Sequence, residues 1–276
     1  MDLYFEMYSG IAGDMIIGSL LDLGANKEKL IEAIASLKLS DYELVFDRVK
    51  KNGIAAYNFD VILKEEHSHH EQEAHHHCHN HCHNHDHEHN HDHDHDHSHG
   101  HEHRNLRTIR NIIENSKLND NIKKNALGIF EIIADAEAKA HGIDKEEVHF
   151  HEVGAIDSII DIVGACVLLD DLDVKNLYFS KLYEGVGYQP CAHGPMPIPV
   201  PAVANIINNL DLPLNIIDEE GEHITPTGAA FVKYFYKKPL SEFKIKNIGL
   251  GAGNKDFEKS TNVLRVMEIE EGKKKL

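Results

Sequence analysis

A histidine-rich tract divides this 276-residue chain into two parts. It holds 19 of the 24 histidines between His67 and His103, mostly alternating with Asn, Asp, Glu or Ser, and it has almost no apolar residues. Such a segment buries too little apolar surface to offset the entropy of ordering, so we expect it to be disordered. The chain should therefore build one domain from residues 1–64 and 106–276, with a surface insertion at 65–105.

Alternating strand and helix patterns in the two flanking parts predict an α/β fold, a single mixed alpha-beta domain. Asn52-Gly53 between two apolar runs favours a β-hairpin. The proline-rich segment 185–202 predicts an extended, rigid loop. We expect strands at 3–8, 42–50, 54–63, 176–180, 245–251 and 263–269, and helices at 15–23, 27–37, 106–113, 122–141, 156–170, 201–210 and 229–236.

The net charge of −18 argues against nucleic acid or an anionic membrane as partner and favours cations. The sequence has no apolar run of about 18 residues, as a transmembrane helix requires. Its start lacks the basic residues and apolar run of a signal peptide. Four cysteines do not form a disulfide scaffold. These features predict a cytoplasmic protein in a reducing compartment.

The tract itself carries metal-binding chemistry. Imidazoles that are largely neutral near pH 7 suit nickel, zinc and copper, and Cys78 and Cys82 add softer donors. The alternation has no tetrahedral spacing, which indicates many weak, interchangeable sites. Metal capture or storage is therefore favoured over an inert linker.

A second polar cluster lies between residues 149 and 161. His149 and His151 would share one face of an extended backbone, and Asp157 and Asp161 would share one face of a helix. The pattern predicts a strand end that leads into a helix. One interpretation is an interior unit whose histidines only accept and donate hydrogen bonds. The addition of Glu152 and two aspartates favours the other, metal binding or acid–base chemistry.

Two glycine-containing turns open helices and could seat an anion on backbone N–H groups. The first runs from Ser9 and Gly10 to Gly13 and Asp14, and its alternative role is a tight turn with Asp14 favoured by the helix dipole. In the second, Thr225 can cap a helix that begins at a proline. The candidate residues are Ser9, Gly10, Gly13, Asp14, Thr225, Thr227 and Gly228. His193, at the bend before the prolines, belongs either to a site wall or to a brace.

These motifs together resemble the LarC family. The resemblance rests on the order and content of four segments: Y-F-E-x-x-S-G-I-A-G-D-M from Tyr4, H-F-H-E-V-G-A-x-D-S-I-x-D-I from His149, A-H-G with P-x-P-x-P-A from Ala192, and T-P-T-G-A-A from Thr225. A histidine-rich insertion at this place is also usual in that family. The sequence contains no Walker lysine, dinucleotide fingerprint or nucleophile elbow that would indicate another family.

The resemblance implies a nickel insertase, a nickel chelatase of the lyase class. Such proteins place nickel into pyridinium bisthiocarboxylate mononucleotide in a CTP-dependent reaction with Mg or Mn, and the cofactor serves lactate racemase-type enzymes. Glu6 stands where the family usually has Asp. Family members also carry a C-terminal domain linked to CTP binding and oligomerisation. We expect it to be absent here, either lost or encoded as a separate chain, and homo-oligomer formation stays part of the expectation.

Nickel insertion needs a phosphate seat, metal ligands and a base for a ring proton. The two helix starts, with His193, are predicted to bind the mononucleotide; alternatively, His193 joins the metal ligands. His149, His151, Glu152 and Asp161 are the predicted metal ligands, and Asp157 or Glu152 the predicted base. Alternatively Asp14, Asp157 and Asp161 bind Mg with a nucleotide. Other function classes are a non-catalytic nickel storage protein or metallochaperone, and a metal-dependent hydrolase.

Overall fold

The structure of the chain is a computed structural model that describes residues 1–64, 104–148, 150, 156–191 and 194–272. The histidine tract expected to be disordered lies outside these residues. The fold of the described residues is a mixed α/β domain, which confirms the predicted class.

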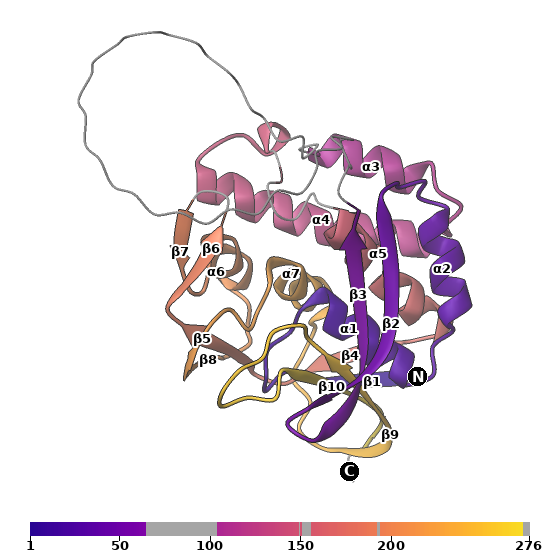
Figure 1. The fold of residues 1–276 in the computed structure, drawn as a ribbon, viewed down its shortest axis with the longest axis vertical. Coiled ribbons are helices and arrows are strands. Elements are labelled where there is room, and N and C mark those ends of the chain that lie inside the picture. Colours follow the sequence, from indigo (N-terminus) through magenta and orange to yellow (C-terminus); the bar gives the residue numbers. More distant parts are fainter. Residues whose placement is uncertain (65–103, 149, 151–155, 192–193, 273–276) are drawn as a thin grey trace, which may run out of the picture.

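A six-stranded sheet forms one side of the domain (Figure 1). Its strands are β1 (Asp2–Glu6), β2 (Tyr42–Lys51), β3 (Ile54–Leu63), β4 (Asn176–Phe179), β9 (Phe243–Ala252) and β10 (Val263–Glu271). They lie in the order β2-β3-β9-β10-β1-β4, with β1–β4 and β3–β9 parallel and the other pairs antiparallel. Strands from both ends of the chain therefore meet in one sheet.

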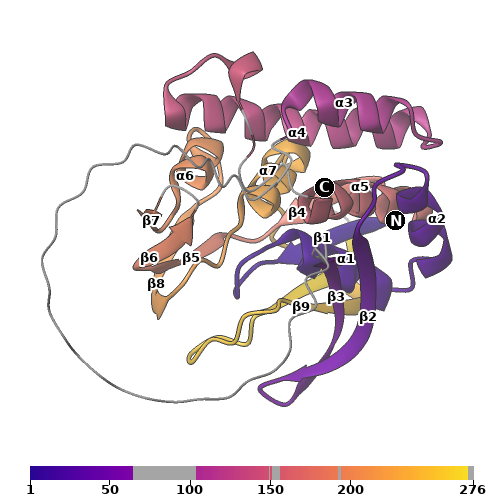
Figure 2. The same ribbon diagram turned by 45° about the horizontal axis from the view of Figure 1, so that its top comes forward.

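The helices stack in layers on the sheet (Figure 2). They are α1 (Gly13–Asp22), α2 (Lys27–Ala35), α3 (Leu106–Glu114), α4 (Asp120–His141), α5 (Ile156–Asp171), α6 (Pro201–Ile207), α7 (Pro226–Phe235) and the short 3-10 helix η1 (Lys145–Glu147). Helix α1 packs on β3 and β9, α5 packs on α1, and α4 covers α5, α6 and α7 with α3 outermost. None of the helices in the described residues has the length and apolar character needed to cross a membrane.

Helix α1 contacts the sheet backbone to backbone. A Cβ added at Gly18 would lie 2.6 Å from the Tyr57 carbonyl oxygen, and one at Gly251 would lie 2.0 Å from the Met15 carbonyl oxygen. Only glycine leaves room for this approach. The N-terminus of α1 is therefore held at a fixed height above β3 and β9.

The sequence predicted most of these elements, including the hairpin. Asn52 and Gly53 both have positive φ, as a two-residue hairpin turn requires. Of the strand end expected ahead of α5, the structure describes only Phe150, and this residue lies in no strand. Phe150 is buried, packs against Phe130, and donates its backbone N–H to the Arg104 carbonyl (3.2 Å).

The segment expected as an extended loop forms paired strands instead. Strands β6 (Tyr188–Cys191) and β7 (Gly194–Pro197) form an antiparallel ribbon, and β5 (Leu182–Val186) pairs in parallel with β8 (Leu214–Glu220). Proline removes one donor per residue, but a two-stranded ribbon leaves one edge of each strand unpaired, so prolines are tolerated there. Pro201 opens α6, as predicted.

Candidate functional site

A cavity of about 440 Å³ lies where the N-termini of α1, α5 and α7 meet β3, β6 and the loop between β9 and β10. Its size is in the range of small-molecule sites. Its polar and charged lining comes from six separate segments: Asp14, Asp60, Asp157, Ser158, Asp161, Gln189, Glu222, His223, Thr225, Thr227, Asn254, Lys255 and Asn262.

Glycines bring the starts of α1 and α7 side by side. Ile11 donates its N–H to the His223 carbonyl (2.9 Å) and accepts from the Thr225 N–H (3.2 Å). A Cβ at Gly10, whose φ is +90°, would lie 2.0 Å from the His223 oxygen, and one at Gly228 would lie 2.3 Å from the Ile11 oxygen. Two helix N-termini with their partial positive charge therefore open onto the same cavity.

A third glycine joins the start of α5 to the start of α1. A Cβ at Gly13 would lie 2.5 Å from both Cβ and Oδ2 of Asp161. The first-turn aspartates of both helices accept nearby backbone N–H groups, Asp14 from Met15 (2.7 Å) and Asp157 from Ser158 (2.8 Å). These contacts fix the three carboxylates at the cavity wall.

The cap of α7 forms as the sequence predicted. Thr225 Oγ1 accepts a hydrogen bond from the Gly228 N–H (3.2 Å), and it lies 2.8 Å from Thr227 Oγ1. In α1, Ala12 provides no side-chain cap. At the N-terminus of α1, Asp14 Oδ1 accepts the Met15 N–H (2.7 Å) instead, so a side-chain oxygen takes one backbone N–H at the start of each helix.

Burial and like charge raise the pKa values of the aspartates. Burial, aided by the charge of Asp60, raises the pKa of Asp14 to about 6. Burial raises the pKa of Asp161 well above its usual range, and the charges of Asp14, Asp157 and Asp60 add to the effect. The pKa of Asp157 is raised by burial and by Asp60. With a pKa of about 6, Asp14 can exchange a proton near neutral pH.

In the described part of the chain, no three His, Cys, Asp or Glu side chains lie close enough together to hold a metal ion. The predicted ligands His149, His151 and Glu152, as well as His193, lie outside the described residues. Of the predicted metal ligands only Asp161 is described, and its role as a ligand stays a prediction.

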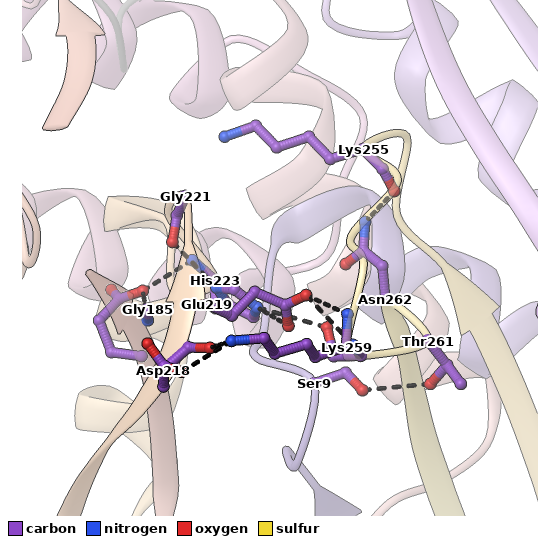
Figure 3. A network of polar contacts seen from close by, with 12 residues as sticks. Ser9, Gly185, Asp218, Glu219, Gly221, His223, Lys255, Lys259, Thr261 and Asn262 are labelled. Atoms are coloured by element: carbon purple, nitrogen blue, oxygen red, sulfur yellow. Dashed lines mark hydrogen bonds and ion pairs between the residues drawn. The ribbon is translucent and has the colours of Figure 1, made fainter. Parts of the chain in front are cut away.

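The cavity collects most of the described residues that the sequence singled out. Those that line it are Gly13, Asp14, Asp157, Asp161, Thr225 and Thr227. Gly228 and Gly10 instead provide backbone clearance beside it. Ser9 is buried and lies 3.2 Å from Thr261 Oγ1, away from the lining (Figure 3). Direct contact of these three with a nucleotide stays a prediction.

Sequence reasoning missed His223, whose ring and backbone both make contacts that fix its position. Its Nδ1 donates to the Gly221 carbonyl (2.9 Å), its Nε2 lies 3.3 Å from Glu219, and its ring stacks on Phe257 at 3.9 Å (Figure 3). Glu184 Oε1 accepts the His223 backbone N–H (2.7 Å), and burial raises the pKa of Glu184. This network fixes the segment that leads into α7. A lone histidine two residues after a glycine carries no periodic signal in the sequence.

Sequence reasoning also missed Asp60 and the loop that carries Lys255. Asp60 belongs to none of the motifs identified in the sequence and lies within β3. Asn254 Nδ2 donates to Asp60 Oδ1 (3.1 Å), which joins that strand to the β9–β10 loop at the cavity. The only available signal was the glycine run that ends at Gly253.

Comparison with known proteins assigns the family. The model of the family described as nickel insertion protein matches residues 3–276. The chain is 47% identical to a pyridinium-3,5-bisthiocarboxylic acid mononucleotide nickel insertion protein of Alkaliphilus metalliredigens, over 98% of this chain and 61% of the relative. The proteins of the same name from Clostridium acetobutylicum (48%; 98% and 64%) and Acetivibrio thermocellus (39%; 92% and 56%) are similar.

The chain spans about three-fifths of the length of these curated relatives. No solved structure matches it. The family match confirms the resemblance inferred from the motifs: the chain belongs to the nickel insertion protein family.

Proposed function

We propose that this chain inserts nickel into pyridinium-3,5-bisthiocarboxylic acid mononucleotide, the substrate in the names of its relatives. The observation that carries the proposal is the cavity in which three helix N-termini meet four aspartates, three of them with raised pKa values. The helix starts suit a phosphate. The aspartates suit proton transfer.

A proton must leave the pyridinium ring when nickel bonds to carbon. In this step the C–H bond breaks, its proton passes to a carboxylate, and its electron pair forms the bond to Ni(II). Asp157 is the proposed base among the described residues, because a raised pKa strengthens a general base, and Asp161 lies one helical turn away. Glu152 is the alternative base from the sequence.

The proposed nickel ligands His149, His151 and Glu152 lie immediately before α5 in the chain. In the sequence they are close to Asp157, which lines the cavity. Phe150, between the two histidines, is anchored against Phe130, and Asp157 follows as the second residue of α5. Asp161 completes the proposed set. Imidazole and carboxylate are suitable donors for Ni(II).

We also propose CTP with Mg or Mn as co-substrate. A hard cation bound with nucleotide phosphates needs only one or two carboxylates, and the aspartates of the cavity fit that requirement. Asp14 is then the proposed ligand, since Asp157 and Asp161 have roles above. The cofactor would pass to a lactate racemase-type apoenzyme in the cytoplasm.

The test measures nickel transfer to the mononucleotide with the purified chain, alone and with the C-terminal part of a relative added in trans. We expect His151→Ala and Asp157→Asn each to lower turnover by about 100-fold, the effect of losing an acid–base or metal-holding group. His141→Ala and Asp120→Asn, on α4 outside the cavity, are matched controls that should retain activity. Unimpaired turnover in both site variants would contradict the proposal.

Replacing residues 67–103 by a Gly/Ser linker of equal length tests the histidine tract. The number of nickel ions bound per chain should fall, because most imidazoles are removed. Insertion should persist at saturating nickel, since supply then no longer limits it. Equilibrium dialysis measures the stoichiometry. Complete loss of insertion at high nickel would show that the tract takes part in the reaction itself.

The histidine tract also supports a second candidate function, a non-catalytic nickel store or metallochaperone. That function predicts nickel binding that is unaffected by changes at residues 149–161 and independent of nucleotide. The same dialysis experiment, repeated with His151→Ala and with added nucleotide, separates the two.

A further inference from the structure

The cavity is acidic, and the described residues that line it include one lysine and no arginine. Lys255 shares the lining with five described carboxylates: Asp14, Asp60, Asp157, Asp161 and Glu222. The proposed substrate brings a phosphate and two thiocarboxylates, all anionic. An anion that enters an acidic cavity needs a compensating cation, because like charges at short range repel.

The backbone of Lys255 is held from both sides. Its carbonyl oxygen accepts from Asn262 Nδ2 (2.7 Å) and from Lys51 Nζ (3.1 Å), and Gly253 donates its N–H to the Asn262 carbonyl (3.0 Å). Asn262 is buried and has a φ of 47°. The backbone of the loop is therefore already ordered at Lys255. Less conformational entropy is lost when the side chain of Lys255 binds a ligand.

The side chain of Lys255, in contrast, is held loosely. Its Nζ lies 3.2 Å from Gln189 Oε1 and 3.9 Å from Glu222 Oε2, and the side chain is 48% exposed. In Figure 3 it extends from the β9–β10 loop toward Gly221. The ion pair is long and its lysine end is half exposed, so it contributes little, and replacing Glu222 by a phosphate as the partner of Lys255 costs little.

We propose that Lys255 binds the phosphate of the mononucleotide substrate, together with the N-terminus of α1. The Nζ leaves Gln189 and Glu222 and donates to phosphate oxygens, as a lysine at a phosphate site does. This inference rests on the proposed function and names the residue that selects a phosphorylated substrate. Lys255 is a binding residue and takes no part in proton transfer.

The experiment compares the mononucleotide with its dephosphorylated nucleoside in equilibrium binding to the full chain. The parent chain should bind the nucleotide more tightly. In Lys255→Gln we expect nucleotide affinity to fall by about 10- to 100-fold, the value of one charge-assisted hydrogen bond, with nucleoside affinity unchanged. Lys255→Arg should retain much of the preference. The matched control is Lys259→Gln, on the same loop, whose Nζ pairs with Asp218 (2.7 Å) outside the cavity lining.

The outcomes separate the two proposals. If the parent chain binds neither compound, the proposed function fails and the assignment of Lys255 fails with it. If the parent chain binds the nucleotide and Lys255→Gln keeps the full preference for phosphate, only the assignment of Lys255 is overturned. An equal loss of affinity in Lys259→Gln would also overturn it, because the effect would then reflect net charge alone.

Discussion

Asp161→Asn is expected to stabilise the folded chain at pH 7 while it lowers nickel insertion. The Asp161 carboxylate lies against Gly13 and shares the cavity wall with Asp14 and Asp157, so its negative charge is costly in the fold. Asparagine has a similar shape without the charge. We expect the free energy of unfolding to rise by about 1–2 kcal/mol, the gain typical when a strained functional group is replaced.

The sign of the pH dependence follows from the pKa. Burial, then the neighbouring aspartates, raises the pKa of Asp161 above its ordinary 3.8, so the folded chain binds this proton more tightly than the unfolded chain. Stability of the parent therefore falls as pH rises from about 4 through the folded pKa. Asparagine cannot titrate. The difference between variant and parent should be small near pH 4 and should grow as the pH rises towards 8, measured by urea unfolding across that range.

Asp171, at the other end of α5, is the matched control with the opposite sign. Burial alone would raise its pKa, but hydrogen bonds from Lys29 Nζ (2.6 Å) and the Asn26 N–H (2.7 Å) outweigh that effect and lower it. Asp171→Asn should therefore destabilise the chain at pH 7, less so in acid, and leave insertion intact. A loss of stability in Asp161→Asn at pH 7 would contradict the argument.

Short sequence patterns correctly predicted those turns and helix starts that depend on neighbouring residues. The β2–β3 hairpin follows from Asn52-Gly53, and the α7 cap follows from Thr225 and Pro226. The four-residue spacing of Asp157 and Asp161 predicted a shared helix face, and both line the cavity. These features depend on residues close together in sequence, where periodicity and capping act directly.

The rest depends on contacts between distant segments. Asp60 and Lys255 reach the cavity because β3 and β9 pair in parallel, which no local pattern encodes. The ribbon of β6 and β7 was expected as an unpaired loop because prolines disfavour strands without excluding edge pairing. Gly13 was selected as a phosphate-binding glycine, and the structure adds a packing reason: the Asp161 side chain occupies the space of its missing Cβ.

Gly13→Ala is expected to cost stability and activity together. The new methyl group would lie 2.5 Å from Cβ and Oδ2 of Asp161, closer than atoms can pack, so α1 and α5 must separate or the carboxylate must move. Overpacking of this kind costs about 1–3 kcal/mol. Nickel insertion should fall because the proposed base and metal ligand sit on the displaced helix. Gly272→Ala is the control, since its methyl group meets its nearest neighbour at an ordinary 3.5 Å.

A double-mutant cycle assigns the cost to this one contact. Asp161→Gly removes the three side-chain atoms that the new methyl group would meet, so Gly13→Ala in that background should be neutral or slightly stabilising through helix propensity. The coupling between the two changes should then exceed about 1 kcal/mol, as for residues in direct contact. Urea unfolding of the four variants at pH 7 measures it. If the two changes in the free energy of unfolding are additive, the requirement for glycine at position 13 does not depend on Asp161. The close packing of α1 on α5 would then not explain the glycine.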